Sequence, residues 1–235
     1  MPIELTELLG AHLRDLGYRP PEPIRMRVVR QGQLGDVATA VARTVAGPDA
    51  QHLAGRLAGR LRSDPGLAQV RAEAGYLTLT LTTGALAGGV HRLLSPGAAR
   101  PSRRTTTDRW PADLHPVALA HARCRNVARA AHAHGVHPPQ GEDLDAALTA
   151  VVGNDCTRSL LVRLGTPTPA GRGAAVTLRE LATSYQDFYA GTRTAPRGSE
   201  PVTSTHRIHL ALTEASAVAL ATGLSSFGLH APEHL

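Results

Sequence analysis

TLRELATSYQDFYAGTRT, residues 177–194, and HRIHLALTEASAVALATGLSSFGLHAPEHL, residues 206–235, are the most regular parts of this chain. Apolar side chains recur in both at the three- and four-residue spacing with which a helix buries one face. The pattern predicts helices over residues 177–192 and 205–224.

The same spacing begins earlier in the chain. One apolar face is formed by Val117, Ala120, Cys124, Val127 and Ala131. The Arg side chains of this segment lie off that face, at Arg123, Arg125 and Arg129. Further helices are expected over residues 143–152 and 157–164. Residues 112–235 are therefore predicted to form an all-α helical bundle.

The first 94 residues mix helical and alternating patterns, which predicts a small α+β domain over residues 1–94. Asp36 follows a glycine-containing turn and is expected to cap a helix that runs to Ala46. The other expected helices cover residues 2–16, 49–62 and 84–94. The expected strands cover residues 24–29, 70–74 and 76–81, the last two forming a hairpin around Gly75.

A basic segment separates the two predicted domains. Residues 95–111, SPGAARPSRRTTTDRWP, contain Pro, Arg, Ser and Thr without an apolar period, as in a linker. Two interpretations stay open for it: a solvated tether, or an arm that follows a phosphate backbone.

The charge balance is basic, and all of it comes from arginine. The chain has 25 Lys+Arg against 19 Asp+Glu, a net charge of +6, and no lysine. A GC-rich genome would explain the missing lysine. Its absence still excludes Schiff-base lysines and P-loop lysines. The sequence pI of about 10.3 is typical of nucleic-acid-binding proteins.

No metal, cofactor or membrane is expected. The candidate metal ligands are His121, Cys124, His132, His134 and His137, and their spacing matches no standard zinc site. The N-terminus lacks a signal-peptide pattern, and no apolar run approaches the roughly 20 residues that span a bilayer. The two cysteines, Cys124 and Cys156, fit a reducing compartment. A cytoplasmic protein is therefore predicted, with Cys124 as a small buried hydrophobe.

Three parts of the chain, in the right order, resemble arginyl-tRNA synthetases. GDVATAVARTVAGPDAQHLAGRLAGRL, residues 35–61, with the following VRAEAGYLTLTLT, is similar to the N-terminal module of that family. VALAHARCRNVARAA, residues 117–131, is similar to the "VQYAHAR" helix that opens the anticodon-binding domain.

The match at residues 177–235 is the most specific. It resembles the family's closing pattern, in which "YL..LA..F..FY...RV" leads to "APERM". The positions in step are Leu181, Ala182, Phe188, Tyr189, Arg193, Arg207, Leu210, Gly223, Leu224, Gly228, Ala231, Pro232 and Glu233.

This resemblance implies a DALR-type anticodon-binding domain over residues 112–235 and a missing catalytic domain. Only residues 95–111 stand where the synthetases carry their Rossmann-type catalytic domain. The "HIGH" element is absent, and "KMSKS" is impossible without lysine. We therefore expect no arginine activation and no enzyme activity.

By position, the resemblance implies an anticodon surface of Tyr189, Arg193 and Leu235. On one helix, Tyr189 and Arg193 would share a face. Core packing is the alternative for Tyr189, and it is the expected role of Phe188. Candidate phosphate contacts, each equally suited to a solvated surface, are Arg123, Arg125, Arg129 and Arg207.

The N-terminal module has lost the side chains with which the family reads the D-loop. Val37 replaces an aromatic residue and Ala40 replaces an asparagine, so base reading there is not expected.

The expected function is that of a non-catalytic tRNA-binding accessory protein, for arginine tRNA. It would serve an enzyme that uses aminoacyl-tRNA, as in a natural-product pathway, or regulate an arginyl-tRNA synthetase. Two alternatives remain: a protein-interaction scaffold that has lost RNA binding, and an enzyme of new chemistry, which would need clustered carboxylates or histidines.

Overall fold

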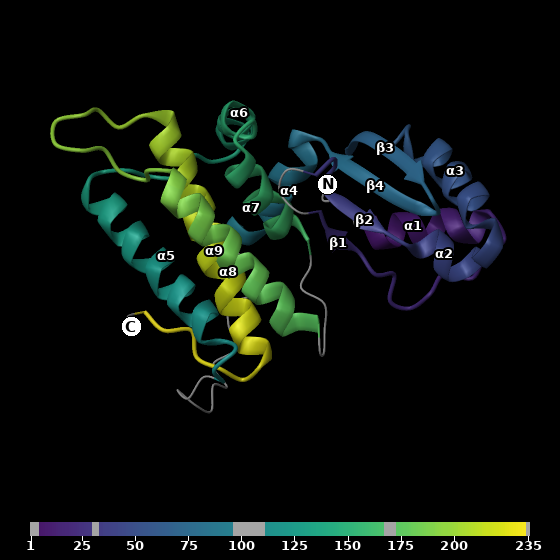
Figure 1. Ribbon diagram of the computed structural model, residues 1–235. Coiled ribbons are helices and arrows are strands. Elements are labelled where there is room, and N and C mark those ends of the chain that lie inside the picture. The colour runs from purple at the N-terminus through teal and green to yellow at the C-terminus, as the bar shows by residue number, and fades with distance from the viewer. Residues whose placement is uncertain (1–4, 30–32, 96–110, 167–172, 234–235) are drawn as a thin grey trace. The chain divides into compact units, whose positions relative to one another are not determined.

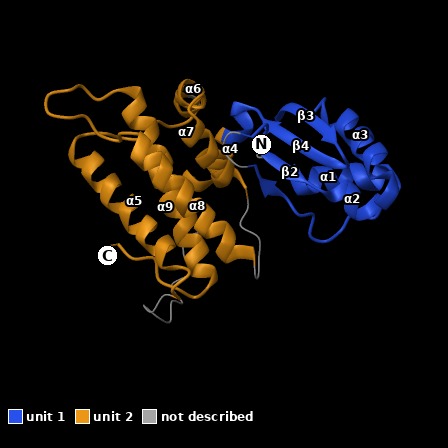
Figure 2. Cartoon of the chain, in the orientation of Figure 1, with its two compact units in different colours: residues 1–86 blue, residues 87–235 orange. Residues whose placement is uncertain are grey.

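The computed structural model describes residues 5–29, 33–95, 111–166 and 173–233. The chain divides into two compact units, residues 1–86 and 87–235 (Figure 2). The first contains helices and a sheet, and the described part of the second is helical (Figure 1), which is the order that the sequence predicts. Most of the expected linker, residues 95–111, lies outside the described residues.

Unit 1 is built on a four-stranded antiparallel sheet in the order β1-β2-β4-β3. The strands are β1 (Arg27–Val28), β2 (Val37–Thr39), β3 (Leu67–Glu73) and β4 (Tyr76–Leu81). Leu77, Leu79 and Leu81 are buried, and the threonines between them are half-exposed, because successive strand side chains point to opposite faces. The predicted β3–β4 hairpin is confirmed.

Unit 1 also contains helical elements. They are α1 (Leu5–Asp15), α2 (Val41–Ala46), the 3₁₀ turn η1 (Gly47–Asp49) and α3 (Ala50–Leu61). Helices α2 and α3 contact the strands of the sheet, α1 packs against α3, and η1 joins α2 to α3. Leu53, Leu57 and Leu61 recur every four residues on α3 and are fully buried against β3 and β4.

Asp36 does not cap a helix, contrary to the prediction. Its Oδ2 accepts a hydrogen bond from the Leu81 N–H at 2.7 Å, and the next three residues form β2. Val37 pairs with Leu79 and is 1% exposed. The β-branched Val37 and Thr39 suit a sheet, so strand pairing prevails over the local capping signal.

Unit 2 is assembled around one apolar helix. Its helices are α4 (Thr83–Leu94), α5 (His115–Ala133), α6 (Glu142–Val151), α7 (Asp155–Gly165), α8 (Ala174–Gly191) and α9 (Ser204–Ser226). α4 starts in unit 1, so the division at residue 86 falls inside this helix rather than after residue 94. α9 contacts α5, α6, α7 and α8.

Within the described residues, α9 is the one helix long and apolar enough to cross a membrane. An 18-residue window in it has a mean hydropathy of 1.3, and 72% of that window is buried inside the protein. Burial on nearly all sides is what a central core helix requires.

The approach of α4 to α7 leaves no space for a side chain at Gly89. A Cβ there would lie 2.6 Å from the Cα of Gly165. We expect Gly89→Ala to lower the free energy of unfolding by about 1–3 kcal/mol, because backbone cannot move aside as a side chain can. Gly84→Ala on the same helix meets open space and should be neutral or slightly stabilising. Urea denaturation followed by circular dichroism measures both variants, and equal effects would contradict the close approach.

Candidate nucleic-acid interface

The neighbouring helices α5 and α8 place Arg123 over the ring of Tyr189. The guanidinium carbon lies 5.2 Å from the ring centroid, within the range of a cation–π contact. Nη1 of Arg123 also donates to Oε1 of Gln186, which precedes Tyr189 by one helical turn. Tyr189 is 43% exposed, and the other two side chains are half-buried. We call Arg123, Gln186 and Tyr189 the Arg123 platform.

The residues beneath this platform belong to the core. Tyr185, Phe188 and Cys124 are all at most 1% exposed, which confirms the core roles predicted for Phe188 and Cys124. The rings of Tyr185 and Tyr189 lie 6.4 Å apart. Burial raises the pKa of the Cys124 thiol and of the Tyr185 hydroxyl, so both stay uncharged. Tyr189 is therefore the exposed end of a buried aromatic group.

Arg193 does not continue the helical face of Tyr189, contrary to the prediction. α8 ends at Gly191, and Thr192 has an extended backbone with φ −134° and ψ 163°. Glycine and β-branched threonine are poor helix formers. The Thr192 hydroxyl donates to the carbonyl of Phe188 at 2.7 Å, which satisfies one of the carbonyls left free at the helix end.

Arg193 is held instead by a loop and by α9. Its Nη1 lies 3.3 Å from Oε2 of Glu200. Its carbonyl accepts a hydrogen bond from Nδ1 of His209 at 2.9 Å. His209 is buried and meets Phe188 edge-on, with ring centroids 5.4 Å apart. Burial lowers the pKa of His209, which outweighs the opposing effect of the carbonyl, so the imidazole is neutral at pH 7.

The segment after α9 folds back onto α5. Nδ1 of His121 donates to the Pro232 carbonyl at 2.8 Å, and burial lowers the pKa of His121. Nε of Arg125 lies 2.9 Å from Oε2 of Glu233, and this hydrogen bond holds the pKa of Glu233 below its ordinary value. Arg129 donates to the Glu233 carbonyl at 3.3 Å. Two candidate phosphate contacts are thus already engaged within the chain.

The remaining predicted site residues lie apart from these contacts. Arg207 is exposed in the first turn of α9 and has no ion pair in the described parts of the chain. Leu235 lies outside the described residues. The predicted residues are therefore distributed over the Arg123 platform, the Arg193 loop, the α5–Glu233 contact and the start of α9.

The histidines considered as metal ligands have other contacts. Nε2 of His132 lies 2.8 Å from Oε1 of Glu214, and its Nδ1 lies 3.1 Å from the Val136 carbonyl. Across the described ranges, no three His, Cys, Asp or Glu side chains gather as a metal site would require.

Sequence reasoning missed the partners of the candidate cations. Gln186 lies three residues before Tyr189, so helical spacing could have placed it on the same face. Glu200 and Glu233 carry no such signal, because Arg125 and Glu233 are 108 residues apart in sequence.

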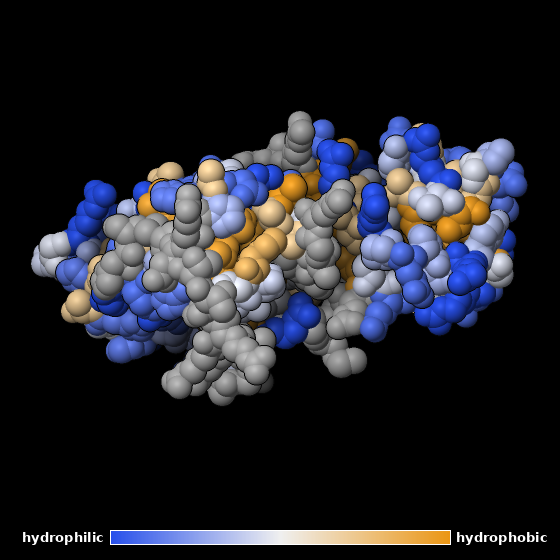
Figure 3. Space-filling model, turned by 90° about the horizontal axis from the view of Figure 1, so that it is seen from below, coloured by the Kyte–Doolittle hydropathy of each residue, from blue (hydrophilic) through white to orange (hydrophobic). Residues whose placement is uncertain are grey.

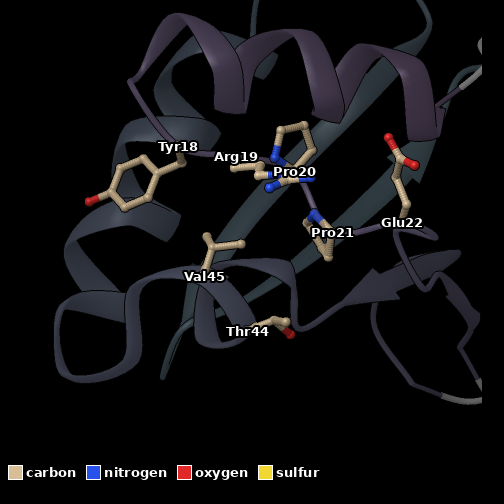
Figure 4. A pocket seen from close by; sticks show the side chains of 7 residues that line it. All are labelled: Tyr18, Arg19, Pro20, Pro21, Glu22, Thr44 and Val45. Carbon is tan, nitrogen blue, oxygen red and sulfur yellow. The ribbon is translucent and has the colours of Figure 1, made fainter.

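Unit 1 contains an open pocket lined by residues 18–22 with Thr44 and Val45 (Figure 4). The Tyr18 hydroxyl points away from the other labelled side chains. The lining of the pocket combines Pro20, Pro21 and Val45 with the polar Arg19, Glu22 and Thr44.

Apolar side chains gather on one face of unit 2 (Figure 3). Separately, the large apolar side chains of unit 2 that are exposed are Leu119 at 41%, Val176 at 47% and Phe227 at 39%. Val176 and Phe227 lie at one end of the α8–α9 pair, because Gly223 of α9 packs against Leu178 of α8.

About half of the chain is similar to known enzymes. Over 134 residues it is 35% identical to an arginine–tRNA ligase of Micrococcus luteus, and over 129 residues 35% identical to those of Pseudarthrobacter chlorophenolicus and Kineococcus radiotolerans. Each match covers 51% of this chain, and the chain spans less than a quarter of each relative, 22–23% of its length. No protein-family model and no solved structure matches the chain. The matched half is therefore related to part of these ligases.

Proposed function

We propose that this chain is a non-catalytic, cytoplasmic tRNA-binding accessory protein that recognises arginine tRNA through unit 2. The observation that carries the proposal is the Arg123 platform, a half-exposed aromatic ring with an arginine over it. Unpaired RNA bases are recognised by stacking on aromatic rings and guanidinium planes. The relatives are named arginine–tRNA ligases, which favours tRNA as the ligand.

The proposed absence of catalysis rests on the sequence. Between the two parts that resemble synthetases stand only residues 95–111, and the chain has no lysine with which to form a "KMSKS" element. Stabilising the phosphates of ATP during adenylate formation needs placed positive groups of this kind. The protein would then present arginine tRNA to an enzyme that uses aminoacyl-tRNA, or regulate an arginyl-tRNA synthetase.

We expect contacts to RNA phosphates to contribute less to the binding affinity than base stacking does. Arg125 and Arg193 already pair with Glu233 and Glu200, so RNA phosphates must exchange with carboxylates. With roughly three phosphate contacts, the logarithm of the affinity should fall with the logarithm of the salt concentration with a slope of about −2.

Binding of purified arginine tRNA and of a non-cognate tRNA, measured at about 50 and 200 mM salt, tests the proposal. We expect micromolar or tighter binding that prefers arginine tRNA and weakens by roughly tenfold or more at the higher salt. Arginine-dependent ATP–pyrophosphate exchange should be absent, with a true synthetase as positive control. No tRNA binding at low salt would remove the tRNA proposal, and exchange activity would remove the non-catalytic one.

A protein-interaction scaffold is the second candidate. The exposed apolar side chains of unit 2, Leu119, Val176 and Phe227, favour it, because exposed apolar surface is a common feature of protein-binding sites. A stoichiometric protein partner that co-purifies without nucleic acid, together with absent tRNA binding, would decide for the scaffold.

A further inference from the structure

We propose that Arg123 is a stacking residue rather than a phosphate contact, and that an unpaired nucleobase stacks on its guanidinium plane with Tyr189 behind it. This inference rests on the proposed function and names the chemistry of its site. The ligand class is a single-stranded nucleotide in an RNA loop.

The guanidinium of Arg123 is positioned by its contacts with Tyr189 and Gln186. It lies over one face of the Tyr189 ring, with its carbon 5.2 Å from the centroid. That face of the ring is therefore not free for a base, and an incoming base on this side meets Arg123 first. Gln186 accepts a hydrogen bond from Nη1, which fixes the plane before any ligand arrives. A side chain ordered in advance loses less entropy on binding.

The partners of Arg123 differ in charge from those of Arg125 and Arg193. Arg125 and Arg193 pair with carboxylates. In the described residues, Arg123 contacts a neutral amide and a neutral ring, and it forms no ion pair. Its positive charge is thus not neutralised by any carboxylate of the described residues. A planar cation backed by an aromatic ring attracts the π-face of any base.

Substituting lysine for Arg123 distinguishes a stacking role from a phosphate-binding role. Lysine keeps the positive charge, and it binds phosphate well, but it has no plane on which a base can stack. Arg123→Lys and Arg123→Ala are therefore compared in the full-length chain, with circular dichroism to show that both are folded. Arg56→Lys and Arg56→Ala are the matched controls, because Arg56 is an exposed residue of α3 in unit 1, outside the unit proposed to bind RNA, and forms no ion pair in the described residues.

The ligands are the anticodon stem-loop of arginine tRNA and the same stem-loop with abasic anticodon nucleotides. Fluorescence anisotropy should show that both Arg123 variants bind the first ligand about tenfold or more weakly than the wild-type chain. The abasic loop should bind weakly and should respond little to either Arg123 variant. Both Arg56 variants should bind like the wild-type chain.

Tyr189→Leu supplies an independent test, because it keeps an apolar side chain on the helix and removes the ring. If the base, Arg123 and Tyr189 form one stack, Tyr189→Leu and Arg123→Lys should weaken binding by less together than the product of their separate effects.

Wild-type affinity in Arg123→Lys would overturn the inference, and so would equal losses of Arg123→Ala on the normal and the abasic loop. Either result leaves tRNA binding intact. Absence of wild-type binding to both intact tRNA and the stem-loop would instead overturn the proposed function, and this inference with it.

Discussion

Replacing Phe188 by alanine is expected to lower the free energy of unfolding of unit 2 by about 3–5 kcal/mol. Phe188 is 1% exposed. Its ring meets His209 edge-on at 5.4 Å and lies 6.3 Å from the Tyr185 ring. The substitution leaves a cavity between α8 and α9 and removes an aromatic contact worth about 0.5–1.5 kcal/mol beyond burial.

The next residue along the chain is the control. Tyr189 is 43% exposed, so Tyr189→Ala should cost less than about 1 kcal/mol of stability while it weakens RNA binding. Urea denaturation of the full chain, followed by circular dichroism at 222 nm, measures both. A loss below about 1 kcal/mol for Phe188→Ala would contradict the placement of its ring in the core.

Periodicity predicted the helices of unit 2 well because their positions depend on which face is apolar. The helix expected over residues 205–224 is Ser204–Ser226. Its first turn is closed by a capping box in which Thr203 and His206 exchange hydrogen bonds. Histidine is not the usual Glu or Gln at that position of the box, so the sequence pattern did not reveal it.

Local sequence signals gave wrong predictions for Asp36 and Arg193, because each residue bonds to a group that is distant in sequence. Asp36 has a side chain suited to capping a helix, yet its carboxylate accepts a hydrogen bond from the Leu81 N–H on strand β4. Arg193 lies four residues after Tyr189, which predicts a shared helical face. The helix ends first, and the Arg193 carbonyl bonds to His209, 16 residues later in sequence.

The resemblance to synthetases indicated Tyr189 as a candidate site residue. It could not indicate which arginines are already bonded to other side chains of the chain. Arg123 and Gln186 are 63 residues apart in sequence, and their contact depends on how α5 packs on α8. The pairing of Arg125 with Glu233 depends equally on the fold. A count of arginines therefore overstates the positive charge that RNA would meet.

Two buried histidines, His121 and His209, are expected to make the stability of unit 2 depend on pH. His121 holds the Pro232 carbonyl next to Glu233, and His209 holds the Arg193 carbonyl. Both imidazoles donate from Nδ1, because a carbonyl can only accept. Both have a pKa lowered by burial from the ordinary value of 6.5. Neighbouring charges act on them as well: Glu233 raises the pKa of His121, and His206 lowers that of His209.

We expect the free energy of unfolding to fall as the pH drops below about 6.5, the ordinary histidine pKa. Below that pH the two histidines are protonated in the unfolded chain but stay neutral in the folded chain. The unfolded state therefore binds more protons, and the free energy of unfolding rises with pH in this range. The contribution is complete above the unfolded pKa and is lost on acidification down to the lowered folded pKa. Each histidine contributes at most about 1.4 kcal/mol per pH unit.

Urea denaturation at several pH values between about 7.5 and 5 measures this slope against the double variant His121→Gln with His209→Gln. The glutamine amide can still donate to the two carbonyls but does not titrate, so the variant should lose less stability on acidification than the wild-type chain. His134→Gln, an exposed residue just after α5, is the matched control and should retain the wild-type slope. Equal slopes for the wild-type chain and the double variant would mean that other groups carry the acid sensitivity. A smaller dependence of stability on pH in the double variant would show that the neutral imidazoles of His121 and His209 carry part of the acid sensitivity. These imidazoles donate hydrogen bonds to the carbonyls of Pro232 and Arg193, so the Glu233 segment and the Arg193 loop would then depend on their neutral state.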